Sequence, residues 1–406
     1  MLKIGDVIEV TAERMAYGGE AVARHEGLAV FIPFAAPGDR LRARITERKK
    51  NFARASIEEI IVPSPLRRAP ICQYFGECGG CQLQHMTYEA QLDAKVSFIR
   101  DALRRVGRID WPQPIATRSA SEFGYRTRAR VKIARAERDA GNHSRAIGFN
   151  CAASHEVLDV AGCPILTPEL DRALHTLRAS INEGANTESR IADLSEVEIA
   201  SGERGVASAP EIAGISSATL QRTIRGAVYR YDAATFFQVN GLLLNELVDE
   251  AVNDYSGRLA IDLYAGVGLF TIQLGRRFEQ VLGVESDARA AKFARQNIRA
   301  NNLSNIAFHK NRAESWLRDF LARRGAQSAP VDLVLLDPPR AGAAEAVPFI
   351  ASLKPSLISY VSCDPTTLAR DLRKLMDSGY ELARVTAIDL FPQTYHVETV
   401  AALRRS

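Results

Sequence analysis

Cysteines are the residues of this sequence whose spacing most directly suggests chemistry. Cys72, Cys78 and Cys81 form the pattern C-x5-C-x2-C, with three glycines between them. Thiolates bind iron–sulfur clusters and zinc, and glycine lets the backbone wrap closely around such a group. The fourth ligand has to come from elsewhere, and Cys163, which precedes Pro164, is the best candidate because a Cys-Pro pair often ends an iron–sulfur ligand set. A zinc site and three unrelated buried thiols are the alternatives.

A second set of residues follows three predicted strands in the C-terminal half. Residues 262–270, DLYAGVGLF, leave a strand and open a helix, and Gly266 and Gly268 allow the backbone to approach a ligand closely. Glu285 ends the next strand, where a carboxylate can accept both hydroxyls of a ribose. The glycine turn alone also suits a nicotinamide-binding domain. Asp337, followed by two prolines at the end of a buried strand, instead favours a methyltransferase.

Cys363 and Glu398 are the candidates for covalent chemistry. Cys363 follows another strand end on the same edge, and the N-terminus of the helix that begins near Thr366 can stabilise a thiolate. Glu398 reaches this edge if the last strands pair antiparallel. A thiolate that adds to carbon 6 of uracil makes carbon 5 nucleophilic toward a methyl donor, and a base then removes the carbon 5 proton. This chemistry requires the base to leave its stack.

Three regions of different pattern must position these residues. Residues 1–62 predict five short strands split by turn residues, which suits a small OB-type barrel. Residues 236–406 alternate strands and helices, as in a doubly wound α/β sheet with its site at the strand C-termini. The region between them, 63–235, starts with a proline-rich linker and contains a helix over 88–107, which we expect to pack on the catalytic domain.

Charge is distributed unevenly, although 52 Lys and Arg against 48 Asp and Glu give a net charge of only +4. Residues 40–50 hold six cations and one acid, which indicates either a solvated edge strand or, favoured on an OB-like barrel, an RNA contact. Residues 125–135 alternate strictly and place four cations on one strand face, which predicts a phosphate-facing surface, with a sheet edge as the alternative. These four are Arg126, Arg128, Arg130 and Lys132.

Composition excludes several classes of protein. A hydrophobic fraction of 46% and a charged fraction of 25% are those of an ordinary globular chain, not of a disordered, collagen-like or coiled-coil one. Six cysteines in 406 residues do not make a disulfide scaffold. No signal peptide and no long apolar run are found, so we expect a cytoplasmic protein without membrane association. No feature indicates an obligate protein partner.

Taken together, the motifs resemble those of the RNA 5-methyluridine methyltransferases, and most closely the 23S rRNA (uracil-5-)-methyltransferases with a TRAM domain and a [4Fe-4S] cluster. The resemblance rests on FFQVN (236–240), DLYAGVGLF (262–270), GVESD (283–287), LLDPPRAG (335–342), YVSCDP (360–365) and DLFPQTYHVE (389–398). It implies a TRAM barrel over 1–62, a central α+β iron–sulfur domain over 63–235 and a Rossmann-like class I methyltransferase domain over 236–406. It also implies S-adenosylmethionine as methyl donor and RNA, most closely 23S rRNA, as partner.

The resemblance also assigns roles. It implies that Cys363 is the nucleophile and Glu398 the base. It implies that the cofactor is held by Gln238, Tyr264, Gly266, Gly268, Glu285 and Asp337. It implies that the cluster ligands are Cys72, Cys78, Cys81 and Cys163, which leaves Cys151 free.

Phe236 matches an aromatic residue expected near the target uracil, with core packing as the alternative. Asp364 stands where the family usually has Asn, and a carboxylate there raises the pKa of a neighbouring thiol. The same reaction on tRNA is an alternative function. A catalytically silent iron–sulfur protein that binds RNA is another, which the presence of Cys363 and Glu398 argues against.

Overall fold

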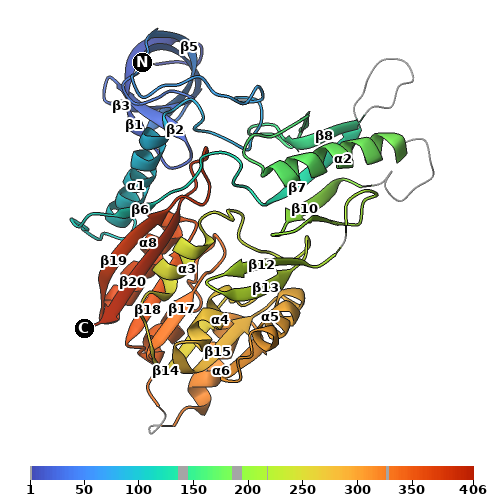
Figure 1. Ribbon diagram of the computed structural model, residues 1–406. Helices are drawn as coiled ribbons and strands as arrows, with labels where there is room; N and C mark the ends of the chain where they lie inside the picture. The colour runs from blue at the N-terminus through green and yellow to red at the C-terminus, as the bar shows by residue number, and fades with distance from the viewer. Residues whose placement is uncertain (1, 136–144, 185–193, 217, 326–328) are drawn as a thin grey trace.

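The computed structural model describes residues 2–135, 145–184, 194–216, 218–325 and 329–406 (Figure 1). The N-terminal strands close into a barrel in the order β1-β2-β3-β5-β4, as expected for an OB-type unit. Alternate residues of β1 and β4 point into its core, so apolar side chains such as Ile8, Val10, Leu41 and Ile45 are buried. The strands are β1 (Val7–Met15), β2 (Glu20–His25), β3 (Leu28–Pro33), β4 (Arg40–Arg48) and β5 (Phe52–Val62).

The helix predicted over 88–107 is α1 (Tyr88–Arg105). The Thr87 side chain accepts a hydrogen bond from the Ala90 amide, which caps its N-terminus. The N-terminal part of α1 contributes Ala90, Ala94 and Phe98 to the core of the barrel, and its C-terminal part contributes Ile99 and Leu103 to the core of the large C-terminal sheet. Figure 1 shows α1 between the barrel and that sheet.

A five-stranded sheet of order β11-β10-β7-β8-β9 forms the centre of the chain. Helix α2 (Pro168–Gly184) covers one face, where Leu170, Leu174 and Leu177 pack against Val131 and Ile199. The strands are β7 (Arg128–Arg135), β8 (Arg145–Asn150), β9 (Val157–Asp159), β10 (Glu196–Ser201) and β11 (Val206–Ala209).

The C-terminal half forms an eight-stranded sheet of order β16-β15-β14-β17-β18-β20-β19-β6. The pairs from β16 to β18 are parallel, and β20 is antiparallel to both of its neighbours. The doubly wound sheet expected from the sequence is therefore present. The strands are β14 (Gly257–Leu263), β15 (Phe278–Glu285), β16 (Ile306–Lys310), β17 (Leu333–Leu336), β18 (Leu357–Ser362), β19 (Tyr380–Ile388) and β20 (Glu398–Arg405).

Helices cover both faces of this sheet. The core of one face contains residues of α1, α6 (Ala313–Arg323), α7 (Val347–Leu353) and α8 (Pro365–Asp377). The core of the other contains residues of α3 (Leu244–Val252), α4 (Leu269–Gly275), α5 (Ala288–Ala300) and the hairpin of β12 (Leu220–Ile224) and β13 (Ala227–Tyr231). No helix in the described part of the chain is long and apolar enough to cross a membrane.

Two segments that precede residue 236 belong structurally to the catalytic unit. The hairpin β12–β13 is joined to α5, because the Asn297 and Asn301 side chains bond the backbone of Arg230 and Val228. Strand β6 (Ala116–Arg118) pairs in parallel with β19 and forms the edge of the large sheet. The catalytic unit is thus assembled from separate parts of the chain.

Candidate active site

The ends of three strands bring the candidate catalytic residues together. Strand β18 pairs antiparallel with β20, and Ser362 lies opposite Thr399. Cys363 follows Ser362 and Glu398 precedes Thr399, so the two residues lie at the same edge of the sheet. The antiparallel pairing on which the position of Glu398 depended is confirmed. Asp337 follows β17, the other neighbour of β18, at this edge.

The turn after β14 has the backbone of a nucleotide-binding loop. Tyr264, Gly266 and Gly268 have φ values of 59°, 55° and 90°, and the two glycines adopt this left-handed conformation without steric cost. The Gly266 amide donates to Oε2 of Glu285 at 2.9 Å, which fixes the turn against the end of β15. Oε1 of Glu285 accepts from the Asp287 amide at 2.6 Å. The carboxylate expected to bind a ribose is therefore held beside the glycine turn.

Three carboxyl groups at the strand ends along this edge of the sheet have perturbed pKa values. Burial raises the pKa of Asp262 to about 7, opposed by a hydrogen bond from Thr271. Desolvation raises the pKa of Asp337 to about 7 as well, opposed by the Gln238 amide, which donates to Oδ2 at 3.2 Å. Burial and then the charge of Asp337 raise the pKa of Glu398 well above its ordinary value. Oε1 of Glu398 has no hydrogen-bond partner among the described residues, so this atom can accept a proton or a ligand donor.

Cys363 lies in an environment that disfavours its thiolate. Burial, and then the charges of Glu398, Asp337 and Asp364, raise its pKa to about 12, although Arg340 acts to lower it. Burial and these carboxylates therefore oppose the stabilisation of a thiolate that we expect from the N-terminus of the following helix. Asp364 itself caps α8, because its Oδ1 accepts from the amides of Thr366 and Thr367 at 2.8 and 2.9 Å. Those amides are thus occupied by a carboxylate.

Arg340 and His396 are site residues that the sequence analysis did not assign. Nη2 of Arg340 lies 3.1 Å from Nε2 of His396. Arg340 lowers the pKa of both Cys363 and Glu398, because its positive charge favours their ionised forms. Burial lowers the pKa of His396 to about 4, so its imidazole is neutral at pH 7. Arg340 directly follows the two prolines after Asp337, and that adjacency was the available signal.

The segment FFQVN has one exposed residue, Phe236, followed by the buried residues Phe237 and Gln238. Phe237 is buried and stacks on Tyr231, with ring centroids 4.3 Å apart. Phe236 is 66% exposed, so the interpretation of Phe236 as a core residue is wrong. Gln238 is buried and donates to Asp337, as described above.

The basic strand of the barrel is neutralised by its neighbours. Arg40, Arg42 and Arg44 of β4 form ion pairs with Glu9, Glu59 and Glu58 on the two adjacent strands. Ion pairs with acids on neighbouring strands explain why arginines occur at these positions of a solvent-exposed strand face. The RNA contact of residues 40–50 stays a prediction, because these three arginines are paired with acids but remain about half exposed.

The alternating segment 125–135 is arranged as predicted, but its cations are largely engaged. Thr127, Ala129, Val131 and Ile133 are buried, and the intervening cations face the other way. Arg130 and Lys132 pair with Glu198 and Glu196 of β10.

Arg128 donates to the carbonyls of Thr235 and Ala233, both at 2.5 Å. Arg128 therefore ties β7 to the segment before Phe236, and the expectation that it contacts phosphate is wrong. Arg126 donates to the carbonyl of Arg128 at 3.0 Å and borders the cysteine cavity described next.

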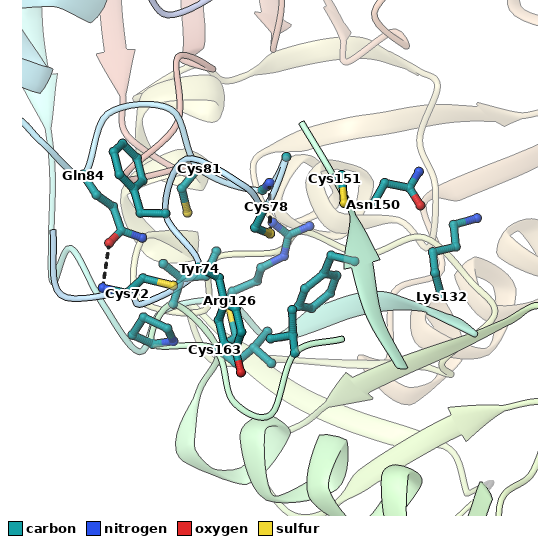
Figure 2. A pocket seen from close by; sticks show the side chains of 18 of the residues that line it. Cys72, Tyr74, Cys78, Cys81, Gln84, Arg126, Lys132, Asn150, Cys151 and Cys163 are labelled. Atoms are coloured by element: carbon teal, nitrogen blue, oxygen red, sulfur yellow. Dashed lines mark hydrogen bonds between the residues drawn. The ribbon is translucent and has the colours of Figure 1, made fainter. Parts of the chain in front are cut away.

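The candidate cluster cysteines line one cavity of about 580 Å³ (Figure 2). Burial, followed by the charges of neighbouring cysteines, raises the pKa of Cys81 to about 12 and that of Cys163 to about 11. Cys151, which the sequence left free, borders the same cavity beside Cys78. The four candidate ligands, Cys72, Cys78, Cys81 and Cys163, are therefore close enough to influence one another electrostatically.

The side chains that line this cavity include several thiols, whose sulfur atoms are soft metal ligands. Figure 2 shows the sulfur atoms of Cys72, Cys78, Cys81 and Cys163 around a common space, and all are free thiols. Sulfur ligands of this kind fit an iron–sulfur group. Within the described ranges, no group of three His, Cys, Asp or Glu side chains is arranged to hold a metal ion, so the iron–sulfur prediction and the zinc alternative both stay predictions.

The strand order, the glycine turn and the carboxylates at the strand ends together define an S-adenosylmethionine-dependent methyltransferase domain of the class I type. Comparisons with known proteins specify the class further. The profile of the tRNA (uracil-5-)-methyltransferases matches residues 215–406, and that of the TRAM domain matches residues 2–57. The chain belongs to the RNA uracil-5-methyltransferase family.

Relatives match over nearly the full length. A 23S rRNA (uracil(1939)-C(5))-methyltransferase RlmD of Alkalilimnicola ehrlichii is 32% identical over 98% of this chain and 96% of its own. An uncharacterized RNA methyltransferase of Halalkalibacterium halodurans is 33% identical over 98% and 97%. The structure of the Pyrococcus abyssi tRNA (uracil-54, C5)-methyltransferase in complex with S-adenosyl-L-homocysteine covers 98% of this chain and 100% of its own, with a TM-score of 0.73 and 25% identity.

Proposed function

We propose that this protein transfers a methyl group from S-adenosylmethionine to carbon 5 of a specific uridine in 23S rRNA. The observation that carries the proposal is the register of β18 and β20, which brings Cys363 and Glu398 to one edge of the sheet. The choice of 23S rRNA is supported by full-length relatives that bear that name.

Cys363 acts as the nucleophile in this proposal. Its thiolate forms a bond to carbon 6 of the uracil, and the electron pair of the ring double bond makes carbon 5 nucleophilic. S-adenosylmethionine, when bound at the glycine turn, supplies the methyl group from its sulfonium. Arg340 favours the thiolate against the three carboxylates that surround it.

Glu398 acts as the base. After methylation it removes the proton from carbon 5, and the bond between Cys363 and carbon 6 breaks as the ring double bond re-forms. A raised pKa makes the ionised form of Glu398 a stronger base than an ordinary carboxylate. Its unpartnered Oε1 is the atom that receives the proton.

RNA reaches this site as a single-stranded or flipped base. The exposed ring of Phe236 offers a stacking surface for the target uracil or a neighbouring base. Arg126, Arg130 and Lys132 border the cysteine cavity, and we assign them to the RNA side of the central domain.

We also propose that Cys72, Cys78, Cys81 and Cys163 hold a [4Fe-4S] cluster. The cluster would join the loop 72–81 to the segment that precedes α2, where the Cys163 amide donates to Asp171 at 2.8 Å. The chain purified without oxygen is expected to be brown, and Cys78→Ser is expected to remove the visible absorbance. Cys151→Ser is the matched control and should retain it. A colourless wild-type protein with one equivalent of zinc would contradict the cluster.

Two variants test the covalent mechanism. Cys363→Ala should abolish methyl transfer while leaving the affinity for S-adenosylmethionine within about twofold, because the thiol acts on the RNA. Glu398→Gln should accumulate a covalent protein–RNA adduct, visible as a shifted band on a denaturing gel. Continued turnover by Cys363→Ala would refute the role of the thiol, and absence of the shifted band would refute that of the carboxylate.

The same reaction on tRNA is the second candidate, favoured by the full-length likeness to the Pyrococcus abyssi tRNA enzyme. Mapping of 5-methyluridine in the total RNA of a deletion strain distinguishes the two. Loss of one methylated position in 23S rRNA supports our proposal, and loss confined to tRNA supports the alternative.

A further inference from the structure

The side chain of Tyr17 extends from the barrel to the edge of the sheet that carries Cys363. Tyr17, in the turn between β1 and β2, donates from its hydroxyl to Oδ2 of Asp364 at 3.1 Å. Its ring lies edge-on to Tyr395 and Phe98, with centroids 5.3 and 5.9 Å away. Tyr17 therefore contacts the residue after Cys363 and the loop that leads to Glu398.

The turn that carries Tyr17 is closely fitted to the rest of the molecule. Gly19 has a φ of 88°, and a Cβ atom added there would lie 2.8 Å from Cβ of Gln82 and 3.5 Å from the Tyr395 ring. Such a separation from Gln82 is shorter than van der Waals contact allows. A residue other than glycine would therefore force the turn, or the segment at Gln82 that it packs against, to move.

The hydrogen bond from Tyr17 to Asp364 acts on the group of charged side chains around Cys363. Cys363 is faced by Glu398 from β20, Asp337 and Arg340 from the segment after β17, and Asp364 from the start of α8. The backbone amides of α8 use Oδ1 of Asp364, and Tyr17 uses Oδ2. A donor on each oxygen disperses the negative charge next to the thiol.

We propose that Tyr17 is a positioning residue of the catalytic centre, supplied by the barrel, which holds Asp364 and makes the Cys363 thiolate easier to form. The inference rests on the proposed role of Cys363 as nucleophile. Burial and Asp364 raise the pKa of Tyr17, so its hydroxyl remains a donor at all pH values at which the enzyme is assayed. The barrel thus contributes to the reaction itself in addition to any contact with RNA.

The test measures the thiol without RNA or cofactor. Iodoacetamide alkylation of Cys363, followed by peptide mass spectrometry across a pH series, reports its thiolate fraction. Tyr17→Phe should slow alkylation at a given pH about 3- to 10-fold, equivalent to an upward shift of the pH profile by roughly 0.5–1 unit. In an Asp364→Asn background the same change should alter the rate less than about twofold, because no carboxylate charge remains to be offset.

Tyr380→Phe is the matched control. Its hydroxyl also donates to one acceptor, the Pro355 carbonyl at 2.9 Å, and Tyr380 lies at the opposite end of β19 from the site. An unchanged alkylation profile in Tyr17→Phe, or an equal effect in both backgrounds, would overturn the proposal. Failure of the proposed function would appear separately, in the Cys363→Ala assay.

Discussion

A buried ion pair joins Lys95 of α1 to Asp389, in the loop that leads from β19 to Glu398. The free energy of unfolding that depends on this pair can be estimated. Nζ of Lys95 donates to Oδ1 of Asp389 at 2.5 Å and to the Phe391 carbonyl at 2.9 Å, and both charged side chains are 1% exposed. Lys95→Met keeps the volume but leaves Asp389 as an uncompensated charge. Removing one partner of a buried pair costs about 3–5 kcal/mol. The Tyr88 hydroxyl still donates to Oδ2, so we expect the lower end, about 3 kcal/mol.

The assay uses the intrinsic fluorescence of the chain. Trp316 and Trp111 both pack into the core that α1 shares with the catalytic sheet, so urea unfolding followed by tryptophan emission reports on this unit. The double variant Lys95→Met with Asp389→Asn removes both charges and retains an acceptor for Tyr88. We expect it to lose about 1 kcal/mol, much less than the single variant. A single-variant loss below about 1 kcal/mol, or equal losses in the two variants, would refute the reasoning.

Three further predictions concern the site. Phe236→Ala should raise KM for RNA about 5- to 150-fold, the equivalent of one lost stacking contact, without changing the urea midpoint, whereas an unchanged KM would exclude stacking. Burial raises the pKa values of Asp262 and Asp337 to about 7, so below that pH the two groups must lose protons to solvent when a cationic cofactor binds. The affinity for S-adenosylmethionine should therefore rise with pH through about 7, and that for the uncharged product S-adenosylhomocysteine should rise less; equal slopes in calorimetric titrations would contradict this. Arg340→Gln should slow Cys363 alkylation, because it removes the cation that lowers the pKa of the thiol, and a faster reaction would reverse the assignment.

The parts of the site that follow local patterns were predictable from the sequence. Gly266, Gly268 and Glu285 lie at strand ends because a parallel sheet places the C-terminus of each strand at one edge. The position of Asp337 follows from the same rule. The role of Glu398 depended on one long-range pairing, between β18 and β20, which the motif order suggested but local spacing does not determine.

Charge compensation between strands was not predictable. Arg40 lies beside Glu9 only through the register of β1 and β4, and a stretch of six cations gives no sign of the acids on neighbouring strands. The contact between Tyr17 and Asp364 joins positions that are far apart in the chain. Helix α2, which spans Pro168–Gly184, was not predicted either.

Strand β6 has a consequence for how the protein is made. Residues 116–118 leave the ribosome early, but their partners on β19, residues 386–388, are among the last to be synthesised. The pairing of β6 with β19 therefore cannot form until translation is almost complete. Until then, α1 and β6 lack their partners in the large sheet, although the barrel residues have already been synthesised. A fragment cut to residues 215–406 would lack β6 and expose the backbone of β19 as an open template for intermolecular pairing. Expression of the catalytic part alone should therefore give aggregates, and co-expression with residues 1–214 should recover folded material.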